Sequence, residues 1–126
     1  MSKKNILILG DILMIAILTI IGFVSHGEAD ASFIPRMGTT FFPAVIGWFL
    51  LAPWFGLFDE TVAVNSKLLW RVPLAMLIAA PLASILRSAM LGSAALPLFT
   101  LILGSTFALG MSIWRTAYLF FIKRRL

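Results

Sequence analysis

The sequence predicts an all-α integral membrane protein, a four-transmembrane-helix antiparallel bundle with both termini in the cytoplasm. Three observations lead to this prediction: four long apolar stretches fill the chain, the segments between them are short, and Lys and Arg gather at one set of ends. Of the 126 residues, 61% are hydrophobic and 12% are charged, whereas soluble domains are about half apolar and about a quarter charged. This composition excludes a soluble domain and predicts one membrane domain over residues 1–126.

Each apolar stretch has the length of a membrane-spanning helix, for which about 20 residues cross a hydrocarbon core ~30 Å thick. The first follows two lysines and precedes Ala29-Asp30-Ala31, a sequence similar to a signal-peptide cleavage site. The stretch is longer than the apolar core of a signal peptide and contains Asp11. These two features favour a retained helix, and cleavage stays the alternative. The four expected helices cover residues 6–24, 41–58, 68–91 and 96–122.

The second stretch is rich in aromatic residues and contains Pro43, Gly47 and Pro53. A proline within a helix removes a backbone hydrogen bond and bends the helix. We interpret the aromatic residues as the belts that lie at membrane interfaces. Binding of a pigment or an isoprenoid tail by this helix is the alternative.

The third and fourth stretches carry further packing signals. Pro81 predicts a kink in the third helix, and Pro97 suits the first turn of the fourth. Gly104 and Ala108 follow Thr100 at intervals of four residues, a spacing of small residues that allows close helix packing. Because the connections are short, consecutive helices are expected to be antiparallel neighbours.

Basic residues predict the orientation of the bundle, since cytoplasmic loops carry an excess of Lys and Arg. With both termini inside, two basic residues, Arg36 and Arg87, lie on the outer side. The inner side then carries the other eight: Lys3, Lys4, Lys67, Arg71, Arg115, Lys123, Arg124 and Arg125. Their position at the membrane edge indicates contact with anionic lipid rather than with nucleic acid.

Asp11 is the first candidate site residue, because a carboxylate inside an apolar helix costs about 2.5–3.5 kcal/mol unless it is paired or hydrated. It lies about 10 Å along its helix from Lys4, and Arg115 lies about 12 Å from Lys123. We therefore predict an inner charged layer of Asp11 and Arg115, with Arg71 as a competing partner. An ion pair that fixes helix register is favoured; a proton or ion relay and simple snorkelling are the alternatives.

Ser25, His26, Glu28 and Arg87 form a second candidate group, an outer polar layer. Such a layer suits an anionic headgroup or a small polar substrate, but a salt bridge that closes the bundle is favoured. His26 is the single histidine, and a metal site with Glu28 and Asp30 has weak support. The chain has no cysteine, which excludes disulfides and thiolate sites. No catalytic residue, metal or cofactor is predicted.

A series of different short motifs occurs along the whole chain in a specific order. They are Gly10-Asp11, Ser25-His26-Gly27-Glu28, Gly47-Trp48, Ala52-Pro53, Gly56, Pro73, Pro81, Leu86-Arg87, Gly92, Pro97, Phe99 and Trp114-Arg115. In this order they resemble an uncharacterised family of small prokaryotic membrane proteins, domain of unknown function 3054. Members often have Arg at the positions of Phe23 or Val24 and after Gly92, so this chain has a thinner outer basic cluster. The resemblance implies a multi-pass protein of the cytoplasmic (inner) membrane of a prokaryote and implies no activity.

Three functions remain open. A structural or accessory subunit of a membrane complex is preferred, with the lipid bilayer and other membrane subunits or a homo-oligomer as partners. A small homo-oligomeric transporter or permease would use Asp11 and Arg115. A membrane enzyme acting on a lipid or isoprenoid would use His26, Glu28 and Arg87.

Overall fold

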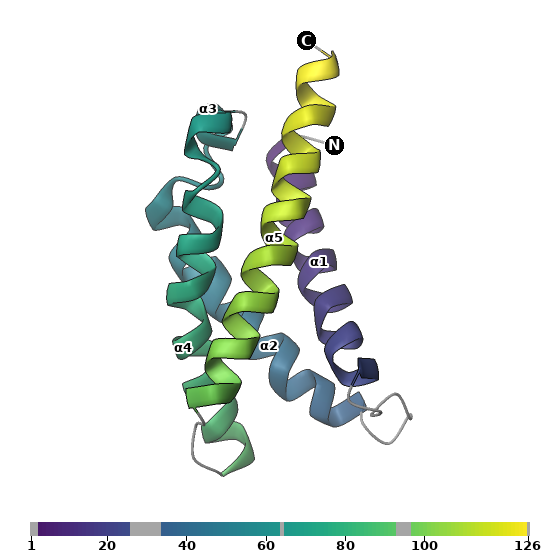
Figure 1. Ribbon diagram of the computed structural model, residues 1–126, viewed down its shortest axis with the longest axis vertical. Helices are drawn as coiled ribbons and strands as arrows, with labels where there is room; N and C mark the ends of the chain where they lie inside the picture. Colours follow the sequence, from purple (N-terminus) through teal and green to yellow (C-terminus); the bar gives the residue numbers. More distant parts are fainter. Residues whose placement is uncertain (1–2, 26–33, 64, 93–96, 126) are drawn as a thin grey trace.

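The computed structural model describes residues 3–25, 34–63, 65–92 and 97–125, and within these ranges it contains helices and turns but no strand. Four long helices account for most of them (Figure 1). These are α1 (Lys3–Ser25), α2 (Ile34–Leu51), α4 (Arg71–Leu91) and α5 (Pro97–Arg125). Between α2 and α4 lie three short elements, the 3₁₀ turns η2 (Ala52–Phe55) and η3 (Ser66–Leu68) and the helix α3 (Glu60–Ala63).

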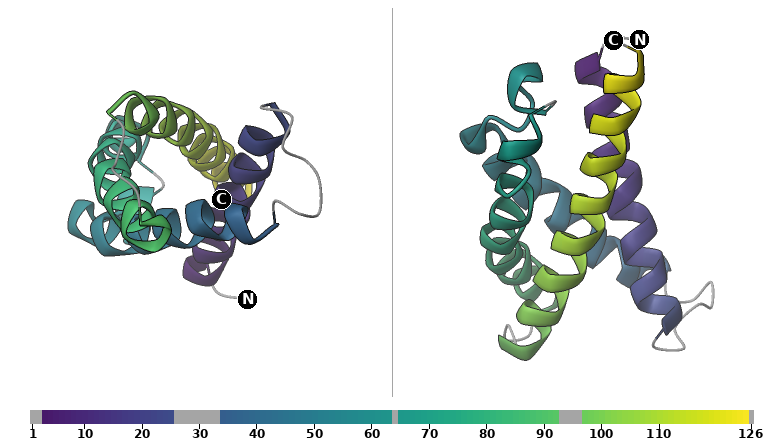
Figure 2. Two further views of the ribbon diagram at one scale, coloured as in Figure 1. Left: turned by 90° about the horizontal axis from the view of Figure 1, so that it is seen from below. Right: turned by 45° about the horizontal axis from the view of Figure 1, so that its top comes forward.

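The long helices contact one another in the cyclic order α1, α2, α4, α5. Helix α5 runs antiparallel to both α1 and α4, while α2 crosses the others obliquely (Figures 1 and 2). The first turn of α1 and the last turn of α5 lie at the same end of the molecule, and α3 lies at that end too. The chain therefore makes an even number of passes along the long axis.

The second helix differs from the prediction at both ends. It begins at Ile34 rather than at 41, because Pro35 occupies its first turn, where a missing N–H costs nothing. The α-helix ends at Leu51 and continues as the 3₁₀ turn η2, with Pro53 near the start of that turn. The kink predicted at Pro53 is therefore a change of helix type at the helix end, whereas Pro43 and Pro81 lie inside α2 and α4.

The described residues between η2 and α4 form the helix α3 and the 3₁₀ turn η3. Gly56 ends η2 with a φ of 69°, a left-handed conformation that glycine adopts readily. Asp59 then caps α3, since its Oδ1 accepts hydrogen bonds from the backbone N–H (3.0 Å) and hydroxyl (2.8 Å) of Thr61. These two bonds lower the pKa of the exposed Asp59 carboxyl below its ordinary value. Asn65 caps η3 in the same way, accepting from the N–H of Lys67.

Three of the described helices are long and apolar enough to cross a membrane: Lys4–Val24, Met37–Phe55 and Ser66–Met90. The sequence predicted four. Helix α5 is longer than the other helices at 29 residues, but its Ser and Thr residues and Arg115 lower its mean hydropathy. Large apolar side chains are exposed along all four long helices, among them Leu13, Leu50, Ile85 and Leu109.

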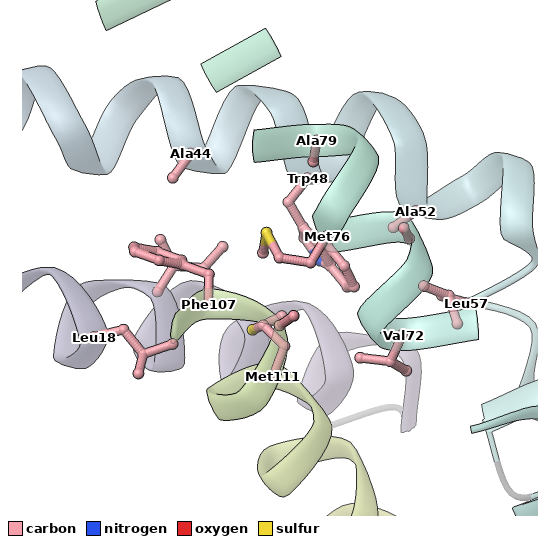
Figure 3. Packing of buried hydrophobic residues seen from close by; sticks show 13 residues of the cluster. Leu18, Ala44, Trp48, Ala52, Leu57, Val72, Met76, Ala79, Phe107 and Met111 are labelled. Atoms are coloured by element: carbon pink, nitrogen blue, oxygen red, sulfur yellow. The ribbon is translucent and has the colours of Figure 1, made fainter. Parts of the chain in front are cut away.

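The core lies where all four long helices meet, and Figure 3 shows Trp48, Met76, Phe107 and Met111 pointing into it. Small residues bring the helices close. A Cβ on Gly47 of α2 would lie 3.0 Å from the carbonyl oxygen of Ala79 in α4, and one on Gly104 of α5 would lie 3.0 Å from the Ala80 Cβ. A larger residue in place of either glycine would push α4 away from α2 or from α5. Ala108, one turn after Gly104, is buried.

Candidate functional site

The Asp11 carboxylate lies at the centre of the bundle and is fully buried, with 0% of its surface exposed. It accepts four N–H hydrogen bonds. The indole N–H of Trp48 in α2 bonds to Oδ2 (2.9 Å), and that of Trp114 in α5 bonds to Oδ1 (2.7 Å). Arg115 supplies the other two through Nε to Oδ1 (3.0 Å) and Nη2 to Oδ2 (2.7 Å). Both carboxylate oxygens are thereby satisfied by protein groups alone.

Arg115 is 1% exposed and uses each of its guanidinium nitrogens. Nε and Nη2 form a two-pronged pair with Asp11, the geometry in which arginine binds a carboxylate best. Nη1 donates to the carbonyl of Leu57, just after η2, at 2.6 Å. The planar group also lies over the rings of Trp48 and Phe58, at 5.9 and 5.4 Å from the ring centroids. The cation is thus shared among α1, α2, α5 and the turn after η2.

Glycine makes room for the Trp114 indole. Gly10 precedes Asp11, and a Cβ on it would overlap the six-membered ring of Trp114. Without that Cβ the indole lies against the α1 backbone, and its N–H reaches the next residue. Gly47, which precedes Trp48, makes room for α4 instead and lets α2 approach it. Trp114 therefore reaches Asp11 because α5 lies unusually close to α1.

Arg71 does not bind Asp11, although the sequence made it a competing partner. Its Nη1 donates to the carbonyl of Phe55 at 3.0 Å, and its guanidinium lies 5.7 Å from the centroid of the Trp70 ring. Arg71 and Arg115 therefore hold two carbonyls of one turn, those of Phe55 and Leu57. The inner charged layer consists of an Asp11–Arg115 pair and a separate Arg71 that secures the end of η2.

The outer polar layer is only partly within the described residues. His26, Glu28 and the side chain of Ser25 lie outside them. Arg87 is described, and its Nε donates to the hydroxyl of Thr40 at 3.3 Å, which links α4 to α2. Near it, the Thr100 hydroxyl donates to the hydroxyl of Ser84 at 2.7 Å and links α5 to α4.

The geometry suits a structural cluster better than a proton relay. We call this cluster the clamp; it consists of Asp11, Arg115, Trp48 and Trp114. A relay requires the carboxyl group to bind and release a proton. In this structure, however, both Asp11 oxygens already accept N–H hydrogen bonds. A proton on either oxygen would take the place of one of these bonds, and the donor of that bond would lose its acceptor. A buried pair that is hydrogen-bonded in this way suits a structural role, in which it holds α1, α2 and α5 in register.

Replacing Asp11 by Ala should lower the free energy of unfolding by about 3–5 kcal/mol, because it leaves the Arg115 charge buried without a counter-charge. Unfolding in mixed detergent micelles, followed by circular dichroism, measures this loss. The double variant Asp11→Leu/Arg115→Met should be more stable than either single variant, since it removes both charges. A double variant no more stable than Asp11→Ala would contradict the assignment of a charge clamp.

Trp48→Phe and Trp114→Phe should each cost about 1.5–3 kcal/mol, because each removes one N–H donor from a charged acceptor. Trp54→Phe is the matched control, since Trp54 is 86% exposed, and surface changes usually stay within about 0.5 kcal/mol. The same unfolding assay compares the three variants. Equal stability of all three would show that the indole bonds to Asp11 contribute nothing.

The sequence pointed to Asp11 and Arg115 but missed both tryptophans as their partners. The available signal was the set of motifs quoted above, since Gly10-Asp11, Gly47-Trp48 and Trp114-Arg115 meet in this one cluster. A family model described as "Protein of unknown function (DUF3054)" matches residues 8–118, a range that contains the whole cluster. No curated protein and no solved structure matches the chain. The chain belongs to the DUF3054 family.

Proposed function

We propose that this chain is a four-pass protein of the cytoplasmic membrane of a prokaryote and acts as a structural subunit of a larger membrane complex. The observation that carries the proposal is a groove between α4 and α5, which is open to the surroundings and lined by small and apolar residues. The Asp11 cluster supports it too, because the buried charges are paired with each other and Arg115 also binds the Leu57 carbonyl.

Length and polarity support a fourth crossing by α5. Its 29 residues correspond to about 43 Å of helix, which exceeds a hydrocarbon core of ~30 Å. Arg115, its one charge within the apolar part, is neutralised by Asp11 inside the bundle. With four crossings both termini lie on one side, in keeping with the common end of α1 and α5 in Figure 1.

Single cysteines introduced into this naturally cysteine-free chain test the topology. A cysteine at Ser93, between α4 and α5, should react with a membrane-impermeant maleimide added outside intact cells, because an N-in, C-in chain exposes this turn. A cysteine at the exposed Ser66 of η3 is the control and should react only after the cells are opened. The reverse pattern would exclude this orientation, and equal labelling of both sites from outside would show that α4 does not cross the membrane and would exclude four crossings.

The α4–α5 groove has a volume of about 390 Å³ and combines small residues with a break in backbone hydrogen bonding. Ala80, Ser84 and Gly104 line it, and small residues of this kind let a transmembrane helix pack closely. Pro81 also lines it and lacks the N–H that would bond to the carbonyl one turn earlier in α4. Hydrocarbon tails cannot satisfy such a carbonyl, whereas a Ser or Thr of a partner helix can. We therefore propose a transmembrane helix of another subunit as the occupant.

A photoactivatable amino acid at Leu101, an exposed residue of this groove, should crosslink one discrete partner protein in native membranes. The same amino acid at Leu109 is the control, since Leu109 is equally exposed on α5 and lines neither of the two grooves described. Mass spectrometry of the adducts identifies the partner. Adducts at Leu101 that match those at Leu109 would overturn the proposal, and a crosslinked pair of this chain would replace it with a homo-oligomer.

A further inference from the structure

A second groove runs along the outside of α1, beside α5, and adjoins the Asp11 cluster through Trp114. Trp114 forms its wall and Gly10 lies at the foot of that wall. Its volume is about 380 Å³, and its lining is almost entirely apolar. The remaining lining residues all belong to α1: Ile6, Leu9, Leu13, Met14 and Ile17.

The groove has the length of one lipid leaflet. Its lining extends from Ile6 to Ile17, which corresponds to about 16 Å of helix. One leaflet contributes about half of a hydrocarbon core ~30 Å thick. A single acyl chain of one leaflet matches this length, and the large apolar side chains of the lining suit such a chain.

Basic residues lie at the end of the groove where a headgroup would sit. Lys4 is exposed, and it precedes the first lining residue by two positions. The last turn of α5 carries Lys123, Arg124 and Arg125. Both ends meet on the same side of the molecule (Figure 1). Along α1, Gly10 lies about 9 Å from Lys4. Along α5, Trp114 lies about 14 Å from Lys123.

We propose that the α1–α5 groove is a binding site for one anionic phospholipid. Its acyl chain lies along α1 against the face of Trp114, and its phosphate lies near Lys4 and the basic end of α5. The apolar groove gives affinity for the chain, and the basic end selects the charge of the headgroup. This inference rests on the membrane location proposed above but not on the partner proposed for the α4–α5 groove.

The site places the lipid directly on the clamp. Trp114 lines the groove with its ring and donates its N–H to Asp11 at 2.7 Å. A bound acyl chain therefore covers the outer face of an indole whose edge is bonded to the buried carboxylate. Occupancy should consequently raise the unfolding temperature of the protein as well as leave a lipid adduct, because a ligand that binds only the folded state stabilises it.

The test uses the full chain in nanodiscs that contain equal amounts of phosphatidylglycerol and phosphatidylcholine with identical acyl chains. Native mass spectrometry should find one phosphatidylglycerol retained in preference to phosphatidylcholine, and phosphatidylglycerol should raise the unfolding temperature. Lys4→Gln should weaken this preference about fivefold, as expected for the loss of one basic residue at a membrane surface. Lys67→Gln is the matched control, since Lys67 is also exposed at this end but does not adjoin the groove.

Leu13→Trp tests the acyl-chain part of the site separately. Leu13 lines the groove and is exposed, so a larger side chain should fill the groove without disturbing the core and should abolish the retained lipid. Ile21→Trp is the control, because Ile21 is exposed on the same helix outside the groove. Equal retention of both phospholipids by the unaltered protein would overturn the proposal. So would equal effects of the two tryptophan variants or of the two lysine variants.

A failure of these lipid experiments is distinguishable from a failure of the proposed function. If the cysteine labelling shows no membrane crossing, the membrane location fails and the lipid site fails with it. If labelling fits four crossings but no anionic lipid is retained, only the lipid site is wrong, and the partner at the α4–α5 groove is unaffected.

Discussion

The bond between Asp11 and Arg115 is the interaction on which the rest of this structure depends. A charge in the apolar interior of a membrane helix is costly unless it has a partner, and here each charge is the partner of the other. The pair forms only when Asp11 and Arg115 lie at the same depth and when α1 and α5 are rotated so that the two side chains face each other. The indoles of Trp48 and Trp114 and the carbonyl of Leu57 add α2 and the turn after η2 to the same centre. One polar cluster thus sets the positions of three helices.

The clamp explains why glycine is placed where it is. Lipid gives helices no hydrophobic reason to associate, so close packing and polar bonds must hold them together. Gly10 leaves the space that the Trp114 ring occupies beside α1, and Gly47 lets α2 lie against the carbonyl of Ala79 in α4. Gly104 likewise lets α5 lie against Ala80 of α4. Large apolar side chains therefore face outward as well as into the core, and the buried charges lie inside the bundle.

The two grooves differ in ways that suggest different occupants. The α4–α5 groove is lined by small side chains and contains Pro81, which interrupts the backbone hydrogen bonds of α4. The α1–α5 groove is lined by large apolar side chains and ends beside basic residues. Small residues and free backbone acceptors suit a protein helix, whereas an apolar channel below a positive surface suits a lipid. The Asp11 cluster adjoins only the α1–α5 groove, through the ring of Trp114.

Hydropathy and residue spacing alone predicted the helical class, the approximate positions of the long helices and the depth at which Asp11 and Arg115 could meet. Hydropathy and the rise per residue are local properties, and they are sufficient for those conclusions. The early start of α2 and the change of helix type at Pro53 depend on caps and turns that hydropathy does not register.

The tertiary structure was needed to show that Arg71 binds elsewhere and that two indoles complete the shell of Asp11. The sequence favoured Arg115 as the partner and kept Arg71 as a competitor, because both are basic residues near the same end. They differ because the turn at Phe55 draws Arg71 away from the bundle centre, while Arg115 reaches Asp11 across the α1–α5 contact. Such a choice rests on how helices distant in the sequence are rotated and spaced, and side-chain packing sets that spacing.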